Sequence, residues 1–267
     1  MLIDFHTHVY DEPGYGEALA ETSKNLGLDC LCIAGGEPRY GLASNAEVRK
    51  QADAYPDLFL PFAQVRLGED GPSSVERLKR IGFRGLCVWG PILPYDDDSY
   101  FPVYEAAEEL AMPVLFHTGF LPRTPLDRSM GVRCANMRPV CLDTIARYFP
   151  RLMVVGVGLG DPWCDEAAET MRHNPNVYFD LSGNLLRRRK PEFFGELLRP
   201  ATSSLWEDGA TENLLARIVF GSAVRHEEIA SVERDYQRVL RSAALGSEDI
   251  DEVMGQTAAR LLDISVE

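Results

Sequence analysis

Three histidines stand where short apolar segments of the chain end. His6 and His8 flank Thr7 after the first such segment, and His117 closes Pro-Val-Leu-Phe-His-Thr-Gly. Side chains two residues apart on a strand share one face and lie about 6.6 Å apart along it, near enough to converge on one ion. Three imidazoles around zinc, with a fourth position open for water, are a known catalytic arrangement. We therefore predict that His6, His8 and His117 hold one divalent metal, with three unconnected core histidines as the alternative.

The segments that must position these histidines alternate along the whole chain between short apolar runs and stretches with amphipathic helical spacing. The apolar runs begin near Leu2, Cys30, Leu58, Phe83, Pro113, Leu152, Val177 and Ile218. Helical spacing covers 43–54, 102–111, 139–148 and 227–243. Eight such units in one chain of 267 residues predict a single-domain (β/α)8 barrel over 1–267, with an open doubly wound sheet as the alternative. In a barrel the carboxyl ends of all strands meet at one mouth, so the three histidines are expected there.

Composition limits the function further. Lys and Arg number 27 against 41 Asp and Glu, a net charge of −14, which disfavours a nucleic-acid partner. The sequence contains no run of about 18 apolar residues, so no membrane span is predicted. It also has no basic segment followed by an apolar one at the start, as a secretory signal would, so we expect a cytoplasmic protein without a membrane partner. The six cysteines are expected to be reduced, and no glycine-rich phosphate loop is found. The sequence is compatible with a homo-oligomer as well as with a monomer.

Four stretches, in this order, resemble the amidohydrolase superfamily. They are Ile-Asp-Phe-His-Thr-His at 3–8, Tyr-Pro-Asp-Leu at 55–58, the run from Tyr-Glu-Ala-Ala to Phe-His-Thr-Gly at 104–119, and Phe-Asp-Leu-Ser-Gly at 179–183. More narrowly, they resemble the branch that includes aminocarboxymuconate-semialdehyde decarboxylase and dicarboxylate lactonases. The resemblance implies a (β/α)8 barrel with one divalent metal, usually zinc. It also implies a metal-ligating Asp after the eighth strand and a proton-transferring His after the sixth.

Two positions depart from that pattern. Gly158 stands where the resemblance implies the histidine, and Ala223, in Gly221-Ser222-Ala223, stands where it implies the aspartate. Neither residue can ligate a metal or move a proton. The three histidines alone would then hold zinc more weakly.

Aspartates near the expected mouth are candidate replacements. Asp180 closes the seventh strand and is our provisional general acid/base, although Phe-Asp-Leu-Ser-Gly suits a structural acid equally well. Asp161 follows the sixth strand, where a solvated helix cap is the simpler interpretation. Asp4 shares the predicted face of His6 and His8 and suits a supporting role. His226 is a further, weaker candidate for the missing histidine.

Basic residues in the two longest connections could bind an anionic substrate. Arg123 and Arg128 follow His117, and Arg187, Arg188, Arg189 and Lys190 form a run after the seventh strand. A solvated loop is the alternative in both places.

Together these features predict a metal-dependent hydrolase or non-oxidative decarboxylase. It would act on a small carboxylated, lactone or amide substrate through a metal-activated water. Because two chemistry-bearing positions are lost, the alternative is a degenerate, non-catalytic barrel that binds a ligand or partner.

Overall fold

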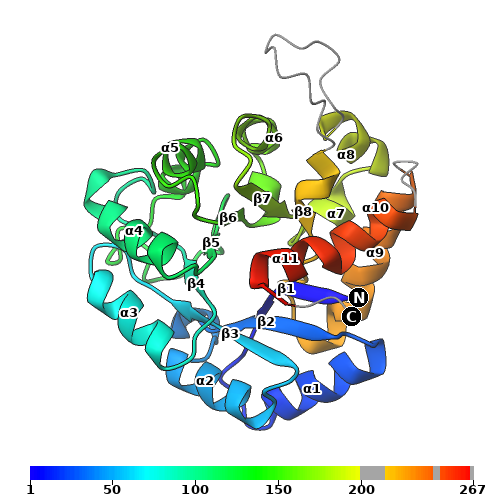
Figure 1. Ribbon diagram of the computed structural model, residues 1–267, viewed down its shortest axis with the longest axis horizontal. Coiled ribbons are helices and arrows are strands. Elements are labelled where there is room, and N and C mark those ends of the chain that lie inside the picture. Colours follow the sequence, from blue (N-terminus) through cyan, green and yellow to red (C-terminus); the bar gives the residue numbers. More distant parts are fainter. Residues whose placement is uncertain (199–213, 243–246, 265–267) are drawn as a thin grey trace.

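The computed structural model describes residues 1–198, 214–242 and 247–264. Eight strands form one sheet in sequence order, and all pairs of neighbours are parallel. The strands are β1 Ile3–His8, β2 Cys30–Ala34, β3 Phe59–Gln64, β4 Gly85–Val88, β5 Val114–Phe116, β6 Val154–Gly156, β7 Val177–Asp180 and β8 Ile218–Val219. The predicted (β/α)8 barrel is thereby confirmed, because each of the eight apolar runs forms a strand and the open sheet does not occur (Figure 1).

Helices follow the strands along the chain; most of them surround the sheet on its outer side, and the last one lies across one end of the barrel (Figure 1). They are α1 Tyr15–Leu26, α2 Asn45–Ala54, α3 Pro72–Arg80, α4 Phe101–Glu109, α5 Cys141–Tyr148, α6 Cys164–His173, α7 Leu185–Arg188, α8 Pro191–Leu197, α9 Ile229–Ser242, α10 Ser247–Asp251 and α11 Thr257–Leu262. Local signals explain several of their starts. The Ser44 hydroxyl accepts a hydrogen bond from the Glu47 amide and caps α2. Pro72 and Pro102 lie in the first turns of α3 and α4, where the missing N–H costs nothing.

The first and last strands approach each other and bring the sheet round on itself. The Phe5 amide donates to the Phe220 carbonyl at 2.8 Å, and the Ala223 amide donates to the His6 carbonyl at 2.7 Å. The Ser222 amide adds a third bond at 3.0 Å, to the Asp4 carboxylate. These contacts place the residues that follow β8 directly beside the candidate residues of β1.

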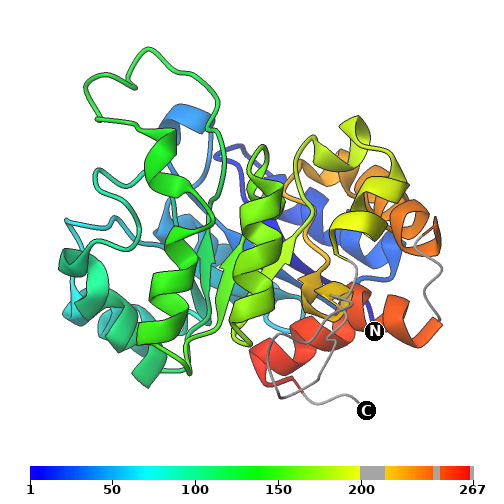
Figure 2. The same cartoon turned by 90° about the horizontal axis from the view of Figure 1, so that it is seen from above.

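Two apolar cores hold the barrel. The larger lies between the strands and the surrounding helices, and the smaller fills the interior of the barrel. The interior core includes Cys30, Cys32 and Cys87, so these thiols are small buried apolar groups. Residues of α11, among them Ala258 and Leu262, pack against it. Figure 2 shows α11 at the end opposite the long β5–α5 connection, so it closes the bottom of the barrel. No helix in the described ranges is long and apolar enough to cross a membrane.

Candidate functional site

A cavity of about 780 Å³ opens where the strands end. Its walls combine histidines, aromatic rings and one pair of opposite charges. The lining residues are His6, His8, Tyr10, Tyr40, Leu42, Trp89, His117, Thr118, Phe120, Leu121, Pro122, Val157, Gly158, Asp161, Pro162, Ser182, Gly183, Asn184, Arg188 and Ala223. The three histidines predicted from the sequence therefore face one cavity, together with Gly158 and Ala223. This cavity lies at the end of the barrel where (β/α)8-barrel enzymes bind their substrates.

A β-bulge in β1 aims His6 into this cavity. Three residue steps on β1, from Asp4 to Thr7, are matched by only two on β2, from Leu31 to Ile33. The alternation of faces is broken there: Phe5 packs in the interior core, and the very next residue, His6, lines the cavity. Simple period-2 spacing correctly put His6 beside His8. It was wrong for Asp4, which does not line the cavity and instead bonds the amides of His6 and Ser222.

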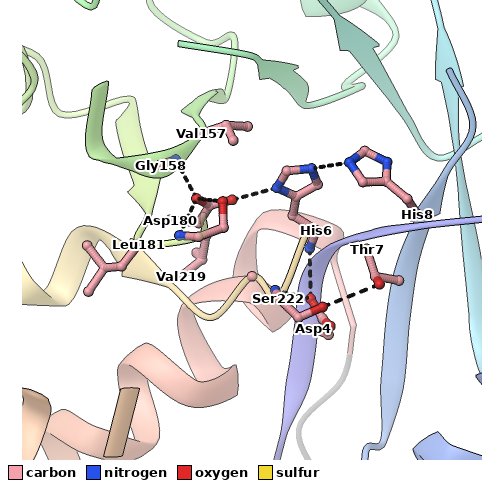
Figure 3. A network of polar contacts seen from close by, with 12 residues as sticks. Asp4, His6, Thr7, His8, Val157, Gly158, Asp180, Leu181, Val219 and Ser222 are labelled. Atoms are coloured by element: carbon pink, nitrogen blue, oxygen red, sulfur yellow. Dashed lines mark hydrogen bonds and ion pairs between the residues drawn. The ribbon is translucent and has the colours of Figure 1, made fainter. Parts of the chain in front are cut away.

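The rings of His6 and His8 turn one nitrogen each toward the same point. Their Nε2 atoms lie 3.2 Å apart, and the Nδ1 atom of His6 lies 2.7 Å from the Asp180 carboxylate (Figure 3). A proton on His6 Nδ1 satisfies that carboxylate and leaves the Nε2 lone pair free. Two nitrogens bound to one tetrahedral zinc at 2.0–2.1 Å would lie about 3.3–3.4 Å apart, so this pair fits such an ion.

Asp180 is held rigidly on the far side of His6. Its side chain is completely buried, and Oδ1 accepts hydrogen bonds from the Gly158 amide (2.6 Å), the Ser182 amide (3.0 Å) and the Ser182 hydroxyl (2.7 Å). Oδ2 faces His6. Asp180 is not part of the cavity lining. These contacts favour a residue that orients His6 over one that exchanges protons directly with a substrate.

Gly221 permits the close approach of Asp180 to His6. A Cβ atom there would lie 2.8 Å from the Asp180 Oδ2 atom and 3.0 Å from the His6 Cβ atom, closer than ordinary packing allows. The neighbouring backbone is fixed by the Tyr236 hydroxyl of α9, which accepts a hydrogen bond from the Leu181 amide at 2.7 Å. The backbone after β8 thus leaves room for the His6–Asp180 pair, although Gly221 itself contributes no side chain.

His8 and His117 are kept uncharged by their surroundings. Burial lowers the pKa of His8 to about 3 and that of His117 to about 4. The His117 Nε2 atom is buried and has no hydrogen-bond partner in the described part of the chain. The Trp89 ring lies near both: it is stacked on His8 with ring centres 6.0 Å apart, and its centre lies 6.2 Å from that of His117. Neutral imidazoles with free lone pairs are the form that ligates metals.

The donor set therefore fits a metal in part. His6 and His8 have the required spacing, and His117 supplies an unpartnered nitrogen in the same cavity. Over residues 1–198, 214–242 and 247–264, however, no three His, Cys, Asp or Glu side chains are grouped closely enough to hold an ion. Ala223 adds no carboxylate, and its backbone is left-handed, with φ of 48°.

Gly158 also has a backbone task. Its φ of 68° is one that glycine adopts without strain, and its amide is the closest donor to Asp180. A Cβ atom at this position would lie 3.3 Å from the Ser182 carbonyl oxygen. The residue at the place of the implied histidine therefore supports the His6–Asp180 pair through its main chain.

Among the predicted basic residues, the structure brings Arg188 to the cavity. Arg123 and Arg128 are exposed and do not line it. Asp161, which we had interpreted as a solvated helix cap, also lines the cavity and pairs with Arg188. Part of the long connection that carries the basic run, 199–213, lies outside the described residues.

Two remaining candidates lie elsewhere or were not foreseen. His226 is not in the lining; its ring contacts the Thr22 hydroxyl at 3.2 Å and Glu227. The aromatic walls, above all Trp89 and Tyr40, were missed by sequence reasoning. Trp89 directly follows β4, and Tyr40 lies in the connection after β2. Residues that follow barrel strands face the mouth, so these positions could have indicated that both rings line the cavity.

Comparison with known proteins identifies the family of the chain. The amidohydrolase family model matches residues 33–264. An uncharacterized TIM-barrel protein from Bordetella bronchiseptica is similar in structure, with a TM-score of 0.73, 19% identity and 98% of each chain covered. The structure of 5-carboxyvanillate decarboxylase from Sphingomonas paucimobilis is similar with a TM-score of 0.67 and 15% identity, and 99% of each chain is covered. The structure of dihydroorotase from Saccharomyces cerevisiae is similar with a TM-score of 0.65 and 12% identity, and the match covers 99% of this chain and 84% of the dihydroorotase chain.

At these identities the structural similarities establish the fold alone. No sequence among the curated proteins matches the chain. The family model, in contrast, spans most of the chain, from β2 to the end of α11. By that match, the chain belongs to the amidohydrolase family.

Proposed function

We propose that this protein is a metal-dependent hydrolase or non-oxidative decarboxylase that acts on a small carboxylated, lactone or amide substrate. The observation that carries the proposal is the 3.2 Å approach of the His6 and His8 Nε2 atoms, with His6 oriented by Asp180. An isolated pair of buried histidines would not need a carboxylate behind one of them to fix its tautomer. The carboxylate–histidine arrangement is the one that supports metal ligands in many enzymes.

His6, His8 and His117 would hold one divalent metal, most simply zinc. Bound there, the metal would supply an acidified water and a Lewis acid for a substrate carbonyl. Asp180 holds the proton of His6 on Nδ1, so the Nε2 lone pair stays available. Burial keeps His8 and His117 neutral, so neither repels a cation.

The cavity suits a small substrate with a flat apolar part. Trp89 and Tyr40 form one wall, with ring centres 5.4 Å apart, and Phe120 stands at another. Such walls exclude water around the reacting atoms and hold a planar group by stacking.

Metal content tests the proposal first. We expect protein purified without chelators to carry close to one zinc or manganese per chain by mass spectrometry. After dialysis to remove metal, cobalt(II) should bind with the visible spectrum of a low-coordinate nitrogen site. His8→Ala should abolish that spectrum, whereas His173→Ala, at the exposed end of α6, should leave it unchanged. A chain that binds neither metal would overturn the proposal.

Turnover tests the chemistry. Lactones, amides, and aromatic or dicarboxylic acids should be screened with the metal-loaded protein, with His117→Ala as the inactive comparison. Loss of turnover in His117→Ala together with retained folding would support its place among the ligands. Equal rates in both proteins would count against it.

A second candidate function is ligand binding without catalysis. The observation in its favour is that Gly158 and Ala223 face the cavity without any group that could move a proton. If this second function is correct, we expect the metal-free protein to bind small ligands saturably and to show no turnover in any of the screens.

A further inference from the structure

One pair of opposite charges lines the cavity, between the loops that follow β6 and β7. The Nη2 atom of Arg188, the last residue of α7, donates to both carboxylate oxygens of Asp161, at 2.7 Å and 2.5 Å. The Arg188 side chain is 56% exposed and that of Asp161 is 24% exposed. Among the described residues in the lining, Arg188 is the sole Lys or Arg.

This ion pair uses only one corner of the guanidinium group. Arginine has five N–H donors in a planar fork, and Asp161 engages the donors on Nη2. The Nε and Nη1 groups of Arg188 have no partner among the described residues. Each of these groups can donate one charge-assisted hydrogen bond to a carboxylate oxygen. Asp161 thus holds the side chain in place while leaving these donors available.

The rest of the described lining offers no second Lys or Arg. Apart from Arg188 and its partner Asp161, the described lining residues are histidine, aromatic, apolar or uncharged polar. Because the pair is partly exposed, opening or sharing it costs little. An anion that enters the cavity would therefore find its strongest electrostatic partner at Arg188.

We propose that Arg188, positioned by Asp161, binds the carboxylate of an anionic substrate whose flat apolar part packs against the aromatic walls. This inference deepens the proposed function, because it selects carboxylates over neutral lactones and amides. It rests on that function only in calling the ligand a substrate, since the binding itself needs no metal.

The test compares benzoate with benzamide, which has nearly the same shape and no charge. Both are titrated by calorimetry into protein freed of metal by dialysis, in metal-free buffer of fixed ionic strength, so that the carboxylate cannot bind through an ion. We expect benzoate to bind about tenfold tighter than benzamide, as for a charge-assisted contact. Arg188→Gln should remove that preference.

Arg187→Gln is the matched control. Arg187 is the neighbouring residue, pairs with Glu228 at 3.3 Å and Asp235 at 3.5 Å, and does not line the cavity. It should leave the preference for benzoate unchanged. Equal losses in the two variants, no preference in the wild-type protein, or no measurable benzoate binding would each overturn the inference.

Asp161→Asn gives a second, opposite result. The amide oxygen still accepts from Arg188 Nη2, but the negative charge is gone, so benzoate should bind several-fold tighter than to wild-type protein. Weaker or unchanged binding would show that Arg188 does not contact the anion. These outcomes are independent of metal content and turnover, so failure here and failure of the proposed function are distinguishable.

Discussion

Asp180 and His6 come from β7 and β1, 174 positions apart in the chain, and their side chains meet at 2.7 Å. Each is placed by backbone rather than by packing alone. The bulge in β1 turns His6 inward, and the amides of Gly158 and Ser182 fix the other oxygen of Asp180. The pair thus joins β1, β6 and β7 at one rim of the barrel.

Replacing Asp180 by Asn should weaken zinc binding while largely preserving the fold. The Asn oxygen would stay with the Gly158 and Ser182 donors, so its NH2 group would face His6 Nδ1. His6 would then carry its proton on Nε2, where it blocks ligation. We expect the dissociation constant for zinc to rise about 10- to 100-fold, measured by competition with a coloured chelator. Unchanged zinc affinity with an unchanged melting temperature would contradict the positioning role.

Replacing Ala223 by Asp should strengthen zinc binding. The left-handed backbone at this position costs alanine about 1 kcal/mol, and Asp adopts it more readily. We therefore expect no loss of thermal stability and at least about tenfold tighter zinc binding, because a carboxylate joins the cavity. Ala223→Asn, which has the same shape without the charge, is the control. Equal effects of the two variants would argue against ligation by this side chain.

The cysteines should differ sharply in reactivity. Burial raises the pKa of Cys30, Cys87 and Cys141 to about 12, so at pH 8 only about one in ten thousand of these thiols is ionised. Cys134, in the β5–α5 connection, is partly exposed. We expect one of the six thiols to react rapidly with a maleimide in the folded protein, and mass spectrometry to locate it at Cys134. Rapid labelling of Cys87 would contradict the closed interior of the barrel.

A carboxylate in the first turn of α5 should make stability depend on pH. Asp143 accepts hydrogen bonds from Arg147 at 2.8 Å and from Asn174 at 2.7 Å, and the contact with Arg147 holds its pKa below the usual 3.8. A lowered folded-state pKa contributes stability above pH 3.8, and that stability is lost as the pH falls through the folded-state value.

Asp143→Asn should therefore reduce the free energy of unfolding by about 1 kcal/mol at pH 7, a modest amount because the pair is partly exposed. The difference should shrink toward zero below pH 3. Urea titrations of both proteins at pH 7 and pH 3 measure it. A difference that grows in acid would contradict the assigned contacts.

The sequence predicts the barrel and the shared location of three histidines, because apolar periodicity and strand ends follow from local residue types. It does not predict the bulge between Asp4 and Thr7, because register depends on the partner strand. For the same reason the sequence offered two roles for Asp180, general acid/base or structural acid, and its contacts with His6 and Gly158 are what favour orientation of His6 over proton transfer. The pairing of Arg188 with Asp161 depends on how two loops lie, which local patterns do not determine.

The seam between β1 and the residues after β8 also orders events during synthesis. His6 leaves the ribosome more than two hundred residues ahead of Phe220 and Ala223, whose main-chain groups hold its strand. A nascent chain that stops before β8 lacks the carbonyl and amide groups that anchor Phe5 and His6. The candidate site therefore takes its final shape only after β8 and the residues that follow it have been made, and a chain truncated before β8 carries the histidines without these anchors.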